Sequence, residues 1–151
     1  MTKTSTFAII ITLLFAIIIT SCKKEKVKGC TISSATNYDS SAEENDGSCQ
    51  FEGKQVFWYG LATSDSLWNI VGATSLTYRV DGSVIAVISA SVYFNTPPTC
   101  GTPGTASITK NLGSSQTGSA SYTVVDNFGT TIWSGTLNFN GNTCNATELI
   151  Y

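Results

Sequence analysis

Residues 54–151 consist of short runs of β-branched and aromatic residues, each bounded by Gly, Asn, Asp or Pro. Runs of this kind are typical of strands, and the residues between them are typical of turns. Helix signals are scarce. About seven strands in roughly 100 residues is the strand density of a β-sandwich. The sequence therefore predicts an all-β domain built as a single sandwich of antiparallel strands.

The clearest local unit is the segment SLTYRV-DG-SVIAVIS, residues 75–89. Asp81-Gly82 is a preferred dipeptide for a two-residue type I′ turn, so the segment predicts a hairpin. Pairing across that turn places Tyr78 opposite Ile85 and Leu76 opposite Val87. We expect five apolar residues of the hairpin to share one buried face. These are Leu76, Tyr78, Val80, Ile85 and Val87.

Further strands are expected at 54–62, 91–95, around 105–112, 119–126 and 130–140. The last two form a hairpin across residues 127–129, and Gly135 marks a bulge or a close approach. Residues 63–75 read as a polar loop without alternation. An immunoglobulin-like or transthyretin-like Greek key is our first expectation, whereas the strand order cannot be read from the sequence.

The chain has five cysteines and no histidine. The absence of histidine removes Ser-His-Asp and Cys-His catalytic arrangements and the common zinc sites. Of the four acids in the β-domain, Asp81 and Asp126 lie at predicted turns, where Asp has a structural role. We therefore expect a protein that is not an enzyme. The net charge of −2, with only 12% charged residues, argues against a nucleic-acid partner.

The odd cysteine count implies that one cysteine has a separate role, and the N-terminus indicates which. An apolar run at residues 7–19 is too short to span a bilayer but suits a secretory signal peptide. The alternative is an N-terminal membrane anchor. "ITSC" at 19–22 resembles the bacterial lipobox, which implies cleavage after residue 21 and a lipid anchor on Cys22. Residues 1–21 are then the signal peptide, residues 22–28 a polar tether, and the location the cell envelope, at the outer membrane.

Export places the other four cysteines in an oxidising compartment, where disulfides persist. A Cys30–Cys49 bridge would close a loop of about 20 residues and contribute roughly 3 kcal/mol. We expect Cys100 and Cys144 to form the second bridge, which ties the Pro-rich loop to the last strand.

Residues 29–53 form a short irregular module with five acidic side chains and no basic one. Oxygen-rich side chains around a Gly turn suit a hard cation such as calcium. The expected ligands are Asp39, Glu43, Asn45 and Asp46. An EF-hand does not fit, because Ala42 and Gly53 would occupy ligand positions. The alternative is a disulfide-closed spacer.

The module resembles a cysteine-bracketed module of secreted bacterial proteins, with the pattern G-C-T-D-P-x-A-x-N-Y-N-P-x-A-x-x-D-D-G-S-C. Eleven positions match, and that module is likened to a calcium-binding repeat. Ile32 and Asn45 replace Asp residues of the pattern, and both replacements lower calcium affinity. The β-domain also resembles small envelope lipoprotein β-modules, through V-D-G at 80–82, P-x-C-G at 98–101 and W-x-G-x-L-x-F…C at 133–144. This resemblance implies an architecture and no activity.

Most aromatic side chains in a small β-domain are needed for its core. Trp68 is the exception, because it lies in the expected polar loop, and we predict that it is an exposed ligand contact. The expected function is non-catalytic binding or scaffolding, with an envelope protein or a glycan as partner. The alternatives are a glycan-binding accessory module, which needs two or three exposed aromatics on one face, and a structural subunit that offers a sheet edge.

Overall fold

The structure, a computed structural model, describes residues 24–151 and is mostly strand. A two-residue parallel pair, β1 (Lys28–Gly29) and β2 (Glu44–Asn45), lies in the module. The β-domain contains seven strands, one short α-helix and one π-helical turn. These are β3 (Phe51–Trp58), α2 (Leu61–Ser66), η1 (Leu67–Val71), β4 (Ser75–Val80), β5 (Ser83–Ser89), β6 (Ala106–Gly113), β7 (Thr117–Asp126), β8 (Thr131–Asn140) and β9 (Cys144–Glu148).

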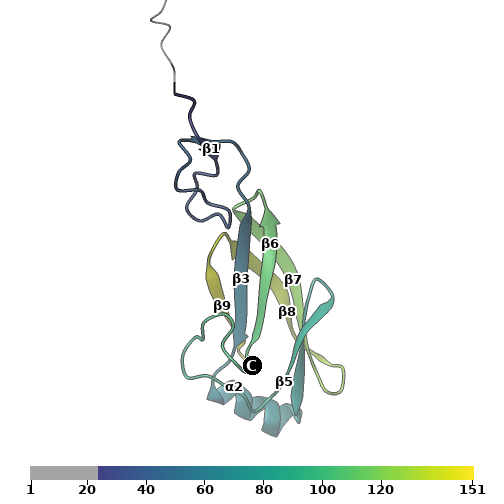
Figure 1. The fold of residues 1–151 in the computed structure, drawn as a ribbon. Helices are drawn as coiled ribbons and strands as arrows, with labels where there is room; N and C mark the ends of the chain where they lie inside the picture. Colours follow the sequence, from purple (N-terminus) through teal and green to yellow (C-terminus); the bar gives the residue numbers. More distant parts are fainter. Residues whose placement is uncertain (1–23) are drawn as a thin grey trace, which may run out of the picture.

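The seven strands form two sheets that face each other, so the predicted sandwich is confirmed (Figure 1). One sheet has the order β6-β3-β9 and the other the order β5-β4-β7-β8. Phe57 of β3 contacts the rings of Tyr78 and Tyr122 from the opposite sheet, with centroids 5.4 and 5.2 Å away. The inner faces of both sheets therefore share one core, which also contains the fully buried Leu76 and Val124.

Two details of the topology go beyond the sequence prediction. The β3–β9 pair is parallel, whereas the other strand pairs of the sandwich are antiparallel. In an immunoglobulin constant-type sandwich the first and second strands are neighbours. Here the first long strand, β3, lies beside β6 and β9 instead, so the strand order differs from that of a constant-type immunoglobulin domain.

The β4–β5 hairpin has the predicted turn but not the predicted register. Asp81 and Gly82 have φ angles of 47° and 79°, as a type I′ turn requires. A bulge then shifts the pairing, so that Tyr78 lies opposite Ala86 and Leu76 opposite Ile88. The predicted pairs with Ile85 and Val87 are therefore wrong. Since the shift turns Val87 outward, its side chain is 63% exposed.

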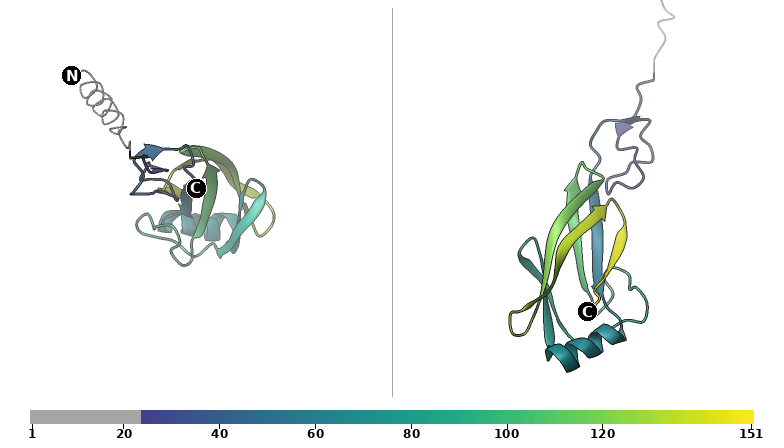
Figure 2. Two further views of the ribbon diagram at one scale, coloured as in Figure 1. Left: turned by 45° about the horizontal axis from the view of Figure 1, so that its top comes forward. Right: turned by 180° about the vertical axis from the view of Figure 1, so that it is seen from behind.

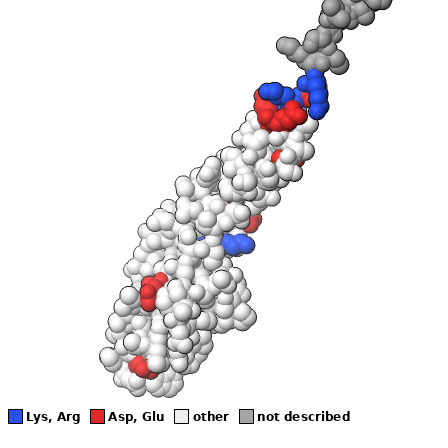
Figure 3. All heavy atoms as spheres, turned by 90° about the vertical axis from the view of Figure 1, so that its left-hand side faces the viewer, with Lys and Arg blue, Asp and Glu red and all other residues white. Residues whose placement is uncertain are grey.

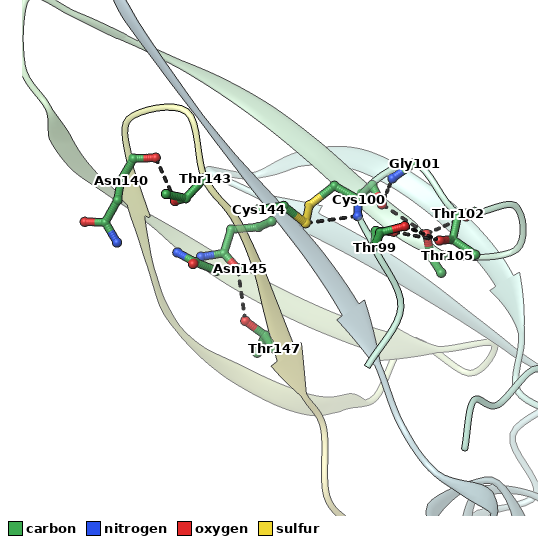
Figure 4. The surroundings of a disulfide bond; sticks show 12 residues. Thr99, Cys100, Gly101, Thr102, Thr105, Asn140, Thr143, Cys144, Asn145 and Thr147 are labelled. Carbon is green, nitrogen blue, oxygen red and sulfur yellow. Dashed lines mark hydrogen bonds between the residues drawn. A yellow bond between two sulfur atoms is a disulfide. The ribbon is translucent and has the colours of Figure 1, made fainter. Parts of the chain in front are cut away.

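A loop lies over part of the outer face of the β6-β3-β9 sheet, around Val56. Val56 points away from Phe57 and the core, because side chains alternate along a strand, yet it is fully buried. Ser107, which lies opposite Val56 on β6, accepts a hydrogen bond at its hydroxyl oxygen from the backbone N–H of Gly101, at 3.1 Å. The Cys100–Cys144 disulfide, predicted from the sequence, fastens this loop to β9 (Figure 4). We call residues 95–105 the Cys100 loop, and it acts as a cover over Val56.

Residues 91–95 do not form the expected strand, because they run as irregular chain into Pro97 and Pro98. Residues 61–71 form α2 and η1 at one end of the sandwich, whereas the end of a strand (54–62) and a polar loop (63–75) were expected there (Figures 1 and 2). Leu67 inserts fully into the core from this helical segment. Gly72, at a φ of 76°, ends the segment in the left-handed conformation that favours glycine.

The module lies at the opposite end of the sandwich from α2 (Figures 1 and 2). Its Cys30–Cys49 disulfide is present as predicted. A small separate cluster surrounds the bridge, formed by Cys30, Ala35, Cys49 and Phe51, with Leu112 of β6 packed against it. Strand β3 thus begins in the module and ends beside α2.

Candidate functional site

A hollow between α2–η1 and the chain that follows β5 is the best candidate site. It is lined by four residues of α2–η1, by the last residue of β5 and by two residues of the chain that follows, and its volume is about 410 Å³. The lining residues are Leu61, Ser64, Asp65, Trp68, Ser89, Ser91 and Tyr93. Small-molecule sites have volumes of about 300–1,000 Å³, so the hollow falls within that range.

Three large apolar side chains around the hollow are exposed. Trp68 is 54%, Leu61 48% and Tyr93 41% exposed. The prediction that Trp68 is exposed is confirmed, whereas Trp58 and Trp133 are half-buried. Trp68 lies on the π-helical turn η1, and such turns are frequent at functional sites.

Hydrogen bonds to one backbone carbonyl hold the two walls of the hollow together. The Ala90 carbonyl accepts hydrogen bonds from the hydroxyls of Ser64, at 2.9 Å, and Tyr59, at 3.2 Å. The Phe94 N–H donates to the Tyr59 carbonyl at 3.0 Å. The wall with Trp68 follows β3 in the chain, and the wall with Tyr93 follows β5. These hydrogen bonds therefore fix the two aromatic side chains to the same part of the sandwich. Burial raises the pKa of Tyr59 to about 12, so this anchoring hydroxyl is neutral at physiological pH.

The polar groups of the hollow are hydroxyls and one carboxylate. The hydroxyl oxygens of Ser89 and Ser91 lie 2.9 Å apart and share a hydrogen bond. Asp65 is exposed and is the only ionisable acid or base in the lining apart from the Tyr93 phenol. The site can therefore offer flat apolar surface together with hydrogen-bond donors and acceptors.

Two other hollows lack this combination. One lies beside the Cys100 loop, has a volume of about 170 Å³, and has no aromatic side chain in its lining. The other has about 430 Å³ and lies over β7 and β8, where its aromatic side chain, Phe139, is fully buried. Within residues 24–151, every buried side-chain N or O atom has a hydrogen-bond partner.

The two acids predicted at turns of the β-domain, Asp81 and Asp126, have structural hydrogen-bond partners there. Lys110 and the Ser121 N–H both hydrogen-bond to the Asp81 carboxylate, at 2.7 and 2.9 Å. The hydrogen bond from Lys110 lowers the pKa of Asp81 most, and the hydrogen bond from the Ser121 N–H lowers it further. Asp126 accepts hydrogen bonds from the N–H groups of Phe128 and Thr130. The turn roles predicted for these two acids are thereby confirmed.

The expected calcium ligands lie in turns of the module. Asp39, Asn45 and Asp46 each accept a hydrogen bond from the backbone N–H two residues ahead, at 2.8–3.0 Å. Hydrogen bonds from Ser41 and Ser48 lower the pKa values of Asp39 and Asp46, respectively. Glu43 lies 3.8 Å from the Lys24 ammonium. In the described part of the chain, His, Cys, Asp and Glu side chains do not gather in a group of three that could hold a metal. Calcium binding stays a prediction, which an unchanged melting temperature on adding chelator would contradict.

Most charge visible from one side gathers on the tether and the module, whereas the sandwich carries little (Figure 3). Cys22, the predicted lipidation site, lies outside the described residues. Across residues 24–151 we find no helix of the length and apolarity needed to cross a membrane.

The sheet edge expected of a structural subunit is partly covered. Strand β8 is an edge strand, and its Asn138 carbonyl accepts side-chain hydrogen bonds from Gln55, at 2.6 Å, and Asn145, at 3.1 Å. Trp133 of the same strand donates to the Ile150 carbonyl at 2.9 Å. Other residues of the same chain therefore already occupy some of the hydrogen-bonding groups of β8.

Comparisons with protein-family models, with curated proteins and with solved structures gave no match for this chain. The site must therefore be interpreted from its own chemistry. Sequence reasoning found Trp68 but missed the other residues of the hollow, because it assigned 54–62 and 91–95 to strands and 63–75 to a polar loop. The Gly60 and Gly72 that bracket the helical segment were the available signal.

Proposed function

We propose that this chain is a lipid-anchored protein of the cell envelope with a non-catalytic binding role. The observation that carries the proposal is the hollow with exposed Trp68 and Tyr93 at the end of the sandwich remote from the module. Exposed apolar side chains grouped around one concavity mark binding surfaces more often than isolated ones do.

The arrangement along the long axis supports this role. An anchor on Cys22 would attach the chain to lipid at the module end. Strand β3 has eight residues and separates the module from α2 by about 26 Å at 3.3 Å per residue. The module and the sandwich together would hold the hollow away from the bilayer and turn it toward solvent.

The chemistry of the hollow favours binding over catalysis. Its only carboxylate, Asp65, has no second acid, histidine or lysine among the lining residues. General acid–base catalysis and activated nucleophiles both depend on such a partner. A rigid, hydroxyl-rich and aromatic surface is sufficient for recognition.

Two measurements test the proposal. Metabolic labelling with an acyl-chain analogue, followed by membrane fractionation, should label the wild type and leave Cys22→Ala unlabelled. Retained label in Cys22→Ala would refute the anchor.

Capture from native envelopes tests the binding role. The wild type should retain envelope material that Trp68→Ala does not retain. Phe128→Ala is the control, because Phe128 is 71% exposed at the β7–β8 turn and does not line the hollow. Equal capture by all three proteins would contradict a binding role for the hollow.

A further inference from the structure

The hollow has the chemistry of a surface that recognises polyhydroxylated rings. The exposed parts of Trp68 and Tyr93 supply apolar ring surface. A sugar ring in the pyranose form has an apolar face of C–H groups, which suits aromatic rings, and an edge of hydroxyls that must keep their hydrogen bonds. Aromatic surface with few polar groups beside it satisfies both needs.

Hydrogen-bonding groups lie beside the aromatic side chains. The Asp65 carboxylate accepts hydrogen bonds, and charge-assisted bonds of this kind are the stronger ones. The Ser89 and Ser91 hydroxyls can each donate and accept. A ligand hydroxyl could replace the hydrogen bond that these two serines share at 2.9 Å.

The charge of the site selects against anionic ligands. No lysine or arginine lines the hollow, and its one formal charge is negative. Of the three basic residues in the β-domain, Lys110 pairs with Asp81 at 2.7 Å, and Lys54 lines the hollow at the Cys100 loop. Arg79 donates to the Gly82 carbonyl at the β4–β5 turn. Phosphates, sulfates and uronates would find no cation to balance them.

We infer that the hollow binds a neutral oligosaccharide, with a pyranose ring against Trp68 and Tyr93 and its hydroxyls on Asp65, Ser89 and Ser91. This inference rests on the proposed binding role and names its ligand class. The volume of about 410 Å³ suits a short segment of a glycan rather than a folded partner.

The test uses the full chain in a detergent that has no sugar headgroup. The probes are neutral oligosaccharides of glucose, mannose, galactose and N-acetylglucosamine, with uronate and sulfated oligosaccharides of the same length. Calorimetry measures affinity, and tryptophan fluorescence reports on Trp68. We expect at least one neutral oligosaccharide to bind, and the acidic ones to bind at least about tenfold more weakly, a difference of 1.4 kcal/mol.

Trp68→Ala should weaken that binding at least about tenfold, and Asp65→Ala should weaken it as well. Phe128→Ala should bind like the wild type. Because Trp68 and Asp65 are exposed, these variants should keep the wild-type melting temperature.

Three outcomes would overturn the inference: no binding of any neutral oligosaccharide at millimolar concentration, equal or tighter binding of uronates, or unchanged binding in Trp68→Ala. If the sugars fail while Trp68-dependent capture of an envelope protein succeeds, the ligand class is wrong and the binding role stands. If both fail, the proposed binding role fails as well.

Discussion

Gly53 lies on the inner face of β3, where the two sheets approach closely. A Cβ added there would stand 2.7 Å from the Cβ of Phe139 and 3.1 Å from the Asn140 carbonyl oxygen. Gly53→Ala should therefore force β3 away from β8. We expect a loss of about 1–3 kcal/mol in the free energy of unfolding, measured by denaturant titration.

Gly60→Ala is the matched control for this substitution. Its added Cβ would meet only the Phe94 carbonyl oxygen, at 4.0 Å, and the φ of −86° suits alanine. We expect a loss below about 1 kcal/mol. Equal effects of the two substitutions would contradict the close approach at Gly53.

Two buried tyrosines make the stability of the sandwich depend on alkaline pH. Burial raises the pKa of Tyr59 to about 12, and burial, followed by the nearby Tyr59, raises that of Tyr78 further. In the unfolded chain both phenols ionise near pH 10. The folded state thus holds protons that the unfolded state has lost, so stability falls as pH rises above 10.

The slope of this fall is at most about 1.4 kcal/mol per pH unit for each tyrosine. Denaturant titrations at pH 9, 10 and 11 should show a shallower fall for Tyr78→Phe than for the wild type. Tyr93→Phe, at an exposed position, should follow the wild type. Identical slopes for all three proteins would contradict the burial effect.

At the scale of elements, the Cys100 loop lies over part of one face of a sheet, and we expect that its removal would expose Val56. The Cys100–Cys144 disulfide joins residues 44 positions apart in the sequence. The chain-entropy model for such a loop gives a contribution of about 4 kcal/mol to the free energy of unfolding. The double variant Cys100→Ser, Cys144→Ser should lose about that free energy of unfolding. The Cys100 loop should also become accessible to limited proteolysis.

Thr102→Ala is the control at this scale. It removes the hydrogen bond from the Thr102 hydroxyl to the Thr99 carbonyl, at 2.7 Å, and leaves the disulfide intact. Its cost should be about 0.5–1.5 kcal/mol. A double cysteine variant no less stable than Thr102→Ala would show that the disulfide does not hold the loop.

Local chemistry made several elements predictable. Asp81-Gly82 fixed the type of the β4–β5 turn because few residues adopt positive φ. The register was missed, since the bulge beside Tyr78 leaves no distinct signal in a run as uniform as SVIAVIS. The helical segment 61–71 was missed because tertiary contacts hold it, through buried Leu67 and the bond from Ser64 to the Ala90 carbonyl.

For the whole molecule, the cysteine count and the expected export predicted two disulfides, and the pairs followed because Cys30 and Cys49 enclose the module and leave Cys100 and Cys144. The sheet order did not, because the parallel β3–β9 pair joins residues about 90 positions apart, as in Lys54 opposite Cys144. Side-chain alternation specifies which face is buried but not which strand is the neighbour. The hollow was unpredictable for the same reason, because it depends on where α2 meets the chain after β5.

The module and the sandwich have separate apolar clusters that meet at Leu112. Cys30→Ser, Cys49→Ser should therefore unfold the module and leave the sandwich folded. Amide hydrogen exchange should show protection lost in residues 29–50 and kept in β4 and β7, the central strands of their sheet. Loss of protection in β4 and β7 would mean that the two parts fold as one unit.

The uneven charge of the molecule has a kinetic consequence. Residues 54–151 contain three basic and four acidic side chains, and two of these seven pair at 2.7 Å. A surface with so little charge produces a weak long-range field, so an approaching ligand is not steered electrostatically. Encounter at the hollow should then be governed by diffusion and orientation alone, with an association rate that barely changes between low and high ionic strength.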